Sequence, residues 1–488
     1  YGNDPQIIIL ENHGIFVSAN TPNEVISIYS EVLSKITERI GDALKPEVLP
    51  IDSKITEVLP AIRMILSDDS TMIVKVRNNS LIANFTHSEC DYQKVALPFT
   101  PDNIVYCKSR YIYLNDCEPE KLIENFKSQL ERFVDDYGYT PKVLLIKDIG
   151  LVAIEDTSKA AETVLDVFED MMSISLHSNQ FGGPRFMTAE QIAFIDSWEV
   201  ENYRRAAAKK SAGGGRVANK IIVVTGAARG FGAGIAQDLF SEGANIVVAD
   251  INEQEGEELV LSMNSSGRSN RAIFTKTNVA DAPSVQNLML ETVCEFGGLD
   301  VFISNAGILR AGGLNEMEPD VFELMTKVNY TAYYLCAKYA SMVMKLQQQY
   351  KKDYYMDIIQ INSKSGLKGS NKNFAYAGAK FGGIGLTQSF ALELIPHNIK
   401  VNSICPGNFF DGPLWSDPET GLFVQYLRAG KVEGAKSIED VKQYYESQVP
   451  CGRGCTVADV TKAILYVIDQ CYETGQAIPV TGGQNMLN

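Results

Sequence analysis

A glycine-rich turn in the C-terminal half of the chain has the residue types that bind a pyrophosphate. Gly226, Gly230 and Gly232 follow the strand-like run 221–225 and precede the helix-like run 233–240. Glycines at this spacing let the backbone approach a pyrophosphate closely, and the helix that follows directs its N-terminus at the negative charge. Such turns also occur by chance as flexible loops, so the prediction of a dinucleotide site depends on residues further along the chain.

Asp250 is the first of these residues and stands at the end of the next strand-like run, 244–249. A carboxylate at this position accepts hydrogen bonds from ribose hydroxyls and repels a 2′-phosphate, which favours NAD over NADP. Arg229 favours the opposite choice, since a guanidinium in the glycine turn could reach a 2′-phosphate. We expect NAD and keep NADP as the alternative.

Ser363, Tyr376 and Lys380 could transfer a proton beside such a cofactor. Tyr376 and Lys380 are four residues apart, so a helix presents them on one face. A free phenol titrates near pH 10. Bringing it to about 7 requires roughly 4 kcal/mol, which Lys380 and a cationic nicotinamide could supply together. A Tyr-x-x-x-Lys pair alone is common on solvated helices. Ser363 strengthens the prediction because it ends a strand-like run, where its hydroxyl can bond a substrate oxygen.

Strand-like runs alternate with longer amphipathic segments over residues 219–488 and would position these side chains. The runs are 221–225, 244–249, 272–275, 301–304, 358–362 and 400–404. Such alternation indicates βαβ units and a parallel sheet covered on both faces, an α/β fold of the Rossmann-type doubly wound class. Residues 204–218 lack apolar periodicity and contain three consecutive glycines, so we expect a linker there. Residues 1–203 would then form an N-terminal domain.

The order of these motifs resembles that of the short-chain dehydrogenase/reductase family. The matching positions are the glycine turn from Thr225, Asn305-Ala306-Gly307, Asn329, Ser363, Tyr376, Lys380 and Pro406-Gly407. The resemblance implies that Tyr376 is the general acid/base and that Lys380 lowers its pKa while holding the nicotinamide ribose. It also implies that Ser363 orients the substrate carbonyl and that Asn329 anchors a water in the proton relay.

The motifs and the resemblance together define the expected site. The catalytic residues are Asn329, Ser363, Tyr376 and Lys380. The cofactor contacts are Thr225, Gly226, Arg229, Gly230, Phe231, Gly232, Asp250, Asn278, Val279, Asn305, Ala306, Gly307, Tyr376, Lys380, Pro406 and Gly407. The segment after Gly407 mixes aromatic and charged residues, which favours a small polar substrate such as a hydroxy-aldehyde or a sugar-like molecule.

The N-terminal half contains an approximate internal repeat. Residues 5–32 align without gaps to residues 141–168, at a constant offset of 136. Both copies predict a strand, a turn, a second strand and a helix, with Thr21 and Thr157 as N-caps. His13 in the first copy corresponds to Ile149 in the second. One copy is therefore expected to have served chemistry and the other packing.

The residues around His13, Leu10 to Gly14, are similar to the late part of class II aldolases. That resemblance implies that His13 is one of three zinc ligands in an α/β aldolase-like domain remnant. The chain has four histidines, but none precedes His13 and none forms a His-x-His pair. The zinc site is therefore incomplete: either a preceding segment supplies the rest, or His13 is a packing residue.

End to end, the chain resembles the bifunctional rhamnulose-1-phosphate aldolase/short-chain alcohol dehydrogenase family without the aldolase front. The resemblance implies rhamnose catabolism, a homo-oligomer, and NAD-dependent interconversion of a small alcohol and its carbonyl compound, such as lactaldehyde. Two alternatives stay open. One is a non-catalytic NAD-binding scaffold for an aldolase assembly. The other is a full zinc-dependent aldolase, if a missing N-terminus is present.

The composition argues against several other classes of protein. A net charge of −16 argues against a nucleic-acid surface. No apolar run approaches the roughly 20 residues that span a bilayer, so no membrane partner is expected. Nine dispersed cysteines, an odd number, fit a reducing cytoplasm. The chain opens on Tyr1 in mid-pattern, so we expect it to belong to a longer protein.

Overall fold

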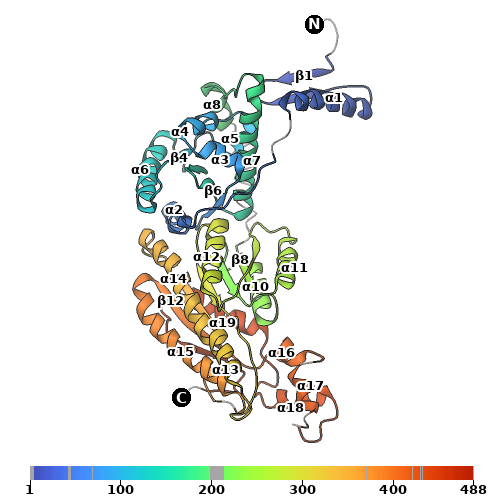
Figure 1. The fold of residues 1–488 in the computed structure, drawn as a ribbon, viewed down its shortest axis with the longest axis vertical. Coiled ribbons are helices and arrows are strands. Elements are labelled where there is room, and N and C mark those ends of the chain that lie inside the picture. The colour runs from blue at the N-terminus through green and yellow to red at the C-terminus, as the bar shows by residue number, and fades with distance from the viewer. Residues whose placement is uncertain are drawn as a thin grey trace. The chain divides into compact units, whose positions relative to one another are not determined.

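The computed structural model describes residues 5–41, 45–68, 70–197, 214–369, 371–419, 421–428, 430 and 432–486. The chain forms two compact units, coloured by residue number in Figure 1. The first comprises Tyr1–Val58 and Met72–Ala212, and the second comprises Leu59–Thr71 and Gly213–Asn488. Most of the predicted linker, residues 204–213, lies outside the described residues. Among the described helices, none combines the length and apolarity that crossing a bilayer requires.

The second unit is built on a seven-stranded sheet with the order β13-β12-β11-β10-β7-β8-β9. All neighbouring strands are parallel. The strands are β7 (Ile221–Thr225), β8 (Asn245–Asp250), β9 (Ala272–Lys276), β10 (Val301–Ser304), β11 (Met356–Ile361), β12 (Ile399–Pro406) and β13 (Ala477–Val480). The predicted doubly wound parallel sheet is confirmed. Strand order reverses between β7 and β10, and in such sheets the carboxyl ends beside the reversal form a ligand crevice.

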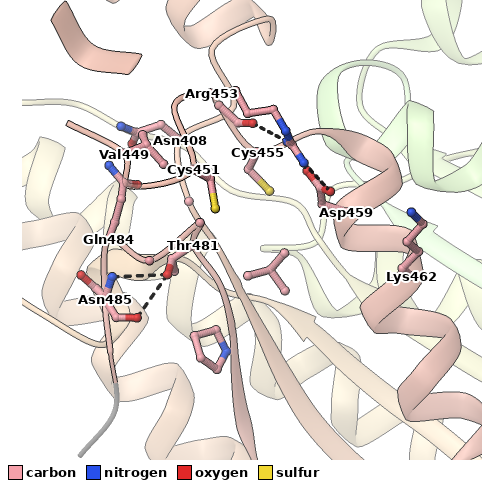
Figure 2. A pocket seen from close by; sticks show the side chains of 16 residues that line it. Asn408, Val449, Cys451, Arg453, Cys455, Asp459, Lys462, Thr481, Gln484 and Asn485 are labelled. Carbon is pink, nitrogen blue, oxygen red and sulfur yellow. Dashed lines mark hydrogen bonds and ion pairs between the residues drawn. The ribbon is translucent and has the colours of Figure 1, made fainter. Parts of the chain in front are cut away.

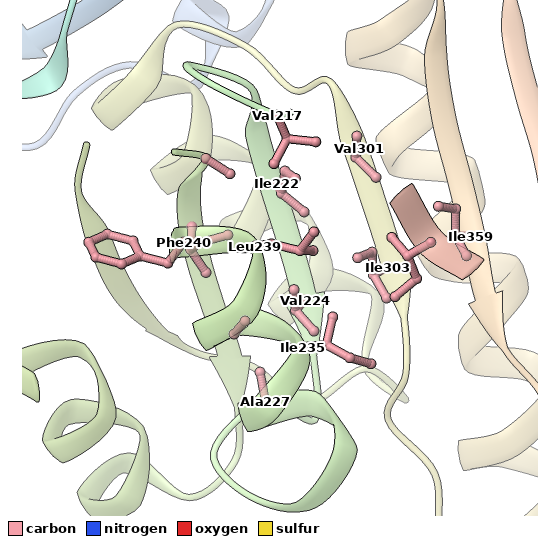
Figure 3. Close-up of a cluster of buried hydrophobic side chains, with 14 of the residues drawn as sticks. Val217, Ile222, Val224, Ala227, Ile235, Leu239, Phe240, Val301, Ile303 and Ile359 are labelled. Carbon is pink, nitrogen blue, oxygen red and sulfur yellow. The ribbon is translucent and has the colours of Figure 1, made fainter. Parts of the chain in front are cut away.

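Helices cover both faces of this sheet. One face packs against α10 (Gly230–Ser241), α11 (Glu253–Asn264) and α19 (Val457–Asp469). Figure 3 shows the aliphatic cluster at this interface, in which Ile222 and Val224 of β7 meet Ile235 and Leu239 of α10. The other helices that contact the strands are α12 (Ala282–Phe296), α14 (Ala332–Tyr350) and α15 (Phe374–Leu394). Shorter helices follow the outer connections: α13 (Pro319–Thr326), α16 (Pro413–Ser416), α17 (Leu422–Arg428) and α18 (Ile438–Ser447).

Helix α2 (Leu59–Leu66) stands early in the sequence but belongs to the second unit. It packs against α14 and α12. Its Arg63 donates two hydrogen bonds to Asp300, of 2.9 and 2.8 Å, and both side chains are fully buried. This corrects the predicted N-terminal domain of residues 1–203. The helix is apolar around nearly its whole circumference, so it is buried against α14 rather than left with its sequence neighbours.

The first unit contains a four-stranded sheet of order β3-β6-β5-β4 and a separate hairpin of β1 and β2. The strands are β1 (Ile7–Leu10), β2 (Gly14–Val17), β3 (Ile73–Arg77), β4 (Ile112–Leu114), β5 (Val143–Ile146) and β6 (Gly150–Glu155). The helices are α1 (Pro22–Ile40), α3 (Ser80–Thr86), α4 (Glu89–Tyr92), α5 (Pro101–Cys107), α6 (Pro119–Tyr137), α7 (Ser158–Ser178) and α8 (Ala189–Ser197).

The strand, turn, strand and capped helix predicted for both copies of the repeat are confirmed. Leu10 pairs with Gly14 in the first hairpin, as Ile146 pairs with Gly150 in the second. Thr21 and Thr157 accept the N-cap hydrogen bonds of α1 and α7. The copies differ in their surroundings, because β1 is exposed along its whole length whereas β5 is buried.

Candidate active site

The glycine turn lies at the carboxyl end of β7, beside the point where strand order reverses. Gly226 and Gly230 have φ values of 62° and 63°, a region that glycine adopts without strain. A Cβ on Gly226 would lie 2.7 Å from the Cα of Ala306, and one on Gly232 would lie 2.2 Å from the Gly226 carbonyl oxygen. The turn therefore requires glycine at two places. It leaves a backbone cradle at the N-terminus of α10, which fits a pyrophosphate.

Asp250 is bonded directly to this turn. One carboxylate oxygen accepts from the backbone N–H of Ala228 at 2.9 Å, and the other accepts from that of Asn252 at 3.0 Å. These bonds hold the carboxylate at the end of β8, beside the glycine cradle. Arg229, the residue that favoured the alternative cofactor, is exposed at the N-cap of α10. The glycine turn and Asp250, predicted to contact the pyrophosphate and the ribose, thus lie next to each other.

The turn after β10 is also tied to the end of β7. The Thr225 hydroxyl accepts from the backbone N–H groups of Asn305 and Ala306, at 3.0 and 3.1 Å. The Asn305 amide donates to the carbonyls of Thr225 and Gly226, at 2.9 and 3.0 Å. In the sequence these residues are separate expected cofactor contacts, and in the structure their hydrogen bonds join them into one wall of the crevice.

Asn329 lies buried in η4 (Lys327–Thr331), a π-helical turn between α13 and α14. Its amide nitrogen donates to the carbonyls of Ile308 and Met325, and its amide oxygen accepts from the N–H of Ile308 at 3.1 Å. A Cβ on Gly307 would approach this oxygen to 2.8 Å. Both N–H groups of the Asn329 side chain are therefore used within the protein. The predicted water would have to donate its hydrogen bond to an oxygen of Asn329.

Ser363, Tyr376 and Lys380 converge beyond the carboxyl end of β11. Ser363 caps the short helix η5 (Lys364–Gly366), and its hydroxyl lies near enough to the Tyr376 hydroxyl to affect the pKa of that phenol. Tyr376 and Lys380 are one turn apart on α15, with the Lys380 Nζ 5.5 Å from the centre of the Tyr376 ring. That Nζ donates to the Ile361 carbonyl at 2.9 Å. The structure brings the three side chains together; their catalytic roles stay predictions.

Burial sets the electrostatics of this group. It raises the pKa of the Tyr376 hydroxyl, and the nearby Ser363 side chain partly opposes that rise. Burial also lowers the pKa of Lys380 to about 8, since the residue is only 4% exposed. Near neutral pH Lys380 is still largely protonated, so a positive charge lies against the phenol ring. The Tyr376 hydroxyl therefore stays protonated near neutral pH unless a ligand adds further positive charge.

The remaining expected cofactor contacts also follow the carboxyl ends of strands. Asn278 is exposed and Val279 is buried, both just beyond β9. Pro406 is the last residue of β12, and the backbone N–H of Gly407 donates to the Val480 carbonyl at 2.9 Å. The predicted cofactor contacts that follow strands thus all lie at the carboxyl edge of one sheet, and Tyr376 and Lys380 reach that edge from α15.

An aromatic contact at the glycine turn was missed by sequence reasoning. Phe231 stacks on Phe409, with 4.2 Å between ring centres. Phe409 starts a segment that has a small core of its own, which includes Phe410, Trp415 and Phe423. The sequence showed these aromatic residues but gave no signal for which of them would reach the turn.

A cavity of about 430 Å³ lies beside Gly407, the one expected site residue in its lining. Figure 2 shows Asn408, Arg453, Gln484 and Asn485 around it. Arg453 is paired with Asp459 at 2.6 Å. The cavity is formed by the C-terminal tail and the segment that precedes α19, so it adjoins the crevice without containing the group of Ser363, Tyr376 and Lys380.

The expected zinc ligand His13 lies outside this site. It is exposed in the turn of the first hairpin, and its ring stacks near Phe16 with 6.3 Å between centres. Among the described residues, no three His, Cys, Asp or Glu side chains are grouped so that they could hold a metal ion. The described part of the chain therefore does not complete a zinc site at His13.

The chain is similar to known dehydrogenases and oxidoreductases. Residues 220–415 match a family model described as short chain dehydrogenase. The chain is 35% identical over 271 residues to sorbitol-6-phosphate 2-dehydrogenase of Escherichia coli K12, covering 55% of this chain and all of that protein. It is 23% identical to the uncharacterized oxidoreductase YuxG of Bacillus subtilis, over 98% of this chain and 72% of that protein. The crystal structure of sorbitol-6-phosphate 2-dehydrogenase from Erwinia amylovora superposes with a TM-score of 0.50 at 35% identity, over 55% of this chain and all of that one.

Proposed function

The chain belongs to the short-chain dehydrogenase family, and on that basis we propose that it reversibly oxidises one hydroxyl of a polyol phosphate to a carbonyl, with NAD as coenzyme. The observation that carries the proposal is the convergence of Ser363, Tyr376 and Lys380 beside the glycine cradle of β7. The substrate class is supported by the 35% identity to a sorbitol-6-phosphate dehydrogenase. It also agrees with the small polar substrate expected from the sequence.

In this proposal the chain's own residues handle the proton. The Ser363 hydroxyl holds the reacting oxygen, and the Tyr376 phenolate removes the hydroxyl proton as the carbonyl forms. Lys380 stabilises the phenolate by its charge, and Asn329 holds the backbone of the loop after β10. When bound, the nicotinamide supplies the hydride acceptor, or the hydride donor in the reverse direction. Thr225, Asn305 and the glycine turn are the residues that would hold the dinucleotide.

The choice of NAD is supported by the position of Asp250. Its carboxylate is fixed beside the glycine turn by two backbone hydrogen bonds, where its negative charge would repel a 2′-phosphate. Arg229 is the competing feature, and its exposure at the surface leaves its side chain solvated. Because the Asp250 carboxylate is held in place and the Arg229 guanidinium is exposed to solvent, we propose NAD rather than NADP.

The first unit is proposed to descend from an aldolase-like domain, on the strength of its repeated hairpin and His13. A zinc-dependent aldolase reaction would need metal ligands beyond the described residues. Metal analysis of the purified protein tests this: stoichiometric zinc lost on replacing His13 with alanine would support an aldolase site. We also propose a homo-oligomer, which light scattering of the purified protein tests.

A substrate panel tests the proposed function. The purified protein is offered sorbitol 6-phosphate, sorbitol and lactaldehyde with NAD or NADP, and the absorbance of the reduced coenzyme is followed. The expected result is NAD-dependent oxidation with the highest kcat/KM for sorbitol 6-phosphate. Coenzyme binding without turnover of any alcohol or carbonyl compound would instead indicate the non-catalytic scaffold.

A further inference from the structure

Lys364 follows Ser363 directly and is held at the carboxyl end of β11. Ser363 accepts from the backbone N–H of Ser365 at 3.1 Å, and this bond fixes the turn in which Lys364 lies. Asn362 holds the same turn from the other side, since its amide oxygen accepts from the N–H of Ser363 at 2.8 Å. The backbone of Lys364 is therefore as well positioned as that of the expected catalytic serine.

The C-terminal tail binds Lys364 at two points. The Lys364 Nζ donates to the amide oxygen of Gln484 at 3.2 Å, and the Asn485 side chain donates to the Lys364 carbonyl at 3.0 Å. The tail is itself held by bonds between Thr481 and Asn485 (Figure 2). Gln484 and Asn485 both line the cavity beside Gly407. The Lys364 ammonium thus lies at the margin between the catalytic serine and that cavity.

The charge of Lys364 is not compensated by any carboxylate in the described part of the chain. Other lysines of the second unit pair with acids, among them Lys276 with Glu253, Lys372 with Glu316 and Lys400 with Asp357. Lys364 bonds a neutral amide instead, although the protein carries 60 acidic residues against 44 basic ones. Its side chain is half-buried, and burial lowers its pKa. A partly desolvated ammonium without a counter-ion is a favourable place for an anionic ligand.

We infer that Lys364, together with the amide of Gln484, binds the phosphate group of the substrate whose hydroxyl reacts at Tyr376. This inference rests on the proposed function and names the residues that select a phosphorylated polyol over a neutral one. Lys364 supplies the charge-assisted hydrogen bond, and the Gln484 amide nitrogen supplies a second donor. The preference for a phosphorylated polyol then comes from the charge of Lys364. This residue follows Ser363, whose hydroxyl holds the reacting oxygen.

The test compares kcat and KM for sorbitol 6-phosphate and sorbitol in five proteins. They are the wild type, Lys364→Met, Lys364→Arg, Gln484→Glu, and the control Lys372→Met, whose lysine is exposed and paired with Glu316 at 3.5 Å. Lys364→Met removes a hydrogen bond to a charged group. We therefore expect kcat/KM for sorbitol 6-phosphate to fall by about 10- to 100-fold, mainly through a higher KM. Activity on sorbitol should stay within about 2-fold of the wild type.

The two remaining variants separate charge from packing. Lys364→Arg keeps the charge and should retain most of the preference for the phosphate. Gln484→Glu is nearly isosteric but gives Lys364 a counter-ion, so it should lose the preference as Lys364→Met does. Equal losses on both substrates would indicate a structural role, and an unchanged preference would show that the phosphate binds elsewhere; either result overturns the inference.

Calorimetric titration with sorbitol 6-phosphate separates this inference from the proposed function. If the wild type turns over neither polyol, the proposed function fails, but the binding measurement still applies. Binding to the wild type that Lys364→Met loses would support the phosphate site. Absence of binding to the wild type, or equal binding to both proteins, would overturn it.

Discussion

Replacing Arg63 is predicted to destabilise the second unit, although Arg63 stands more than 200 residues before the group of Ser363, Tyr376 and Lys380. Its guanidinium makes two hydrogen bonds to Asp300, and neither side chain has any exposed surface. Asp300 also accepts from the backbone N–H of Ile221 at 2.8 Å, at the start of β7. Burial by itself would raise the pKa of Asp300. The charge and hydrogen bonds of Arg63, together with the charge of Lys220 and the Ile221 N–H, outweigh burial and hold that pKa below its ordinary value.

Arg63→Met removes the cation that hydrogen-bonds the buried Asp300 carboxylate and leaves only the charge of Lys220 nearby. Breaking a buried pair in this way costs about 3–5 kcal/mol. The matched control is Arg216→Met, because Arg216 pairs with Asp469 while both side chains are 48% exposed. An exposed pair of this kind contributes about 1 kcal/mol at most. Asp300→Asn in the Arg63→Met background should recover part of the loss, since asparagine keeps an acceptor for Ile221 and removes the charge.

Urea unfolding followed by tryptophan fluorescence measures these differences. The chain has two tryptophans, and a Trp198→Phe background leaves Trp415 as the reporter of the second unit. Because the folded pKa of Asp300 is depressed, the pair contributes fully above the ordinary carboxyl pKa near 3.9. Its contribution is lost as the pH falls through the folded value. If Arg63→Met is no less stable at pH 7 than Arg216→Met, the buried pair does not hold α2 in the unit.

Three further predictions concern the crevice. Asp250→Ser should raise kcat/KM with NADP relative to NAD by at least about 10-fold, measured by initial rates with each coenzyme, and an unchanged ratio would exclude that role for the carboxylate. Alcohol oxidation should increase with pH, since it needs the Tyr376 phenolate, and carbonyl reduction should decrease. Lys380→Met should displace the rising limb of the oxidation profile to higher pH by about one unit or more, and an unmoved limb would refute its role. Phe409→Ala should raise KM for the coenzyme by removing the ring that stacks on Phe231, whereas unchanged coenzyme kinetics would show that the contact is only structural.

The sheet and its crevice were predictable because their signals are local. Each strand of the second unit is an apolar run closed by a polar or glycine-rich turn, and the expected site residues stand at those turns. The order of the motifs along the chain then predicts that Ser363 and Tyr376 meet at one edge of the sheet. The internal repeat was predictable for the same reason, since both copies encode their own turn and N-cap.

Contacts between distant residues could not be predicted in the same way. Arg63 and Asp300 are 237 positions apart, and nothing in the helix of Arg63 indicates which buried acid it meets. Lys364 and Gln484 are 120 positions apart, so the tail contact had no local signal either. The π-helical turn around Asn329 depends on its bonds to Ile308, 21 positions away. In each case a tertiary partner decides the role of a residue whose neighbours in sequence look ordinary.

The most direct test of the central claim is the rate of coenzyme reduction by Tyr376→Phe, measured together with its affinity for NAD. The variant removes one hydroxyl and keeps the ring that lies against Lys380. Loss of the acid/base group should lower kcat for sorbitol 6-phosphate by about 10²- to 10⁴-fold, while the Kd for NAD stays within a few-fold of the wild type. A variant that retains the wild-type kcat would contradict the assignment of Tyr376 and with it the proposed chemistry.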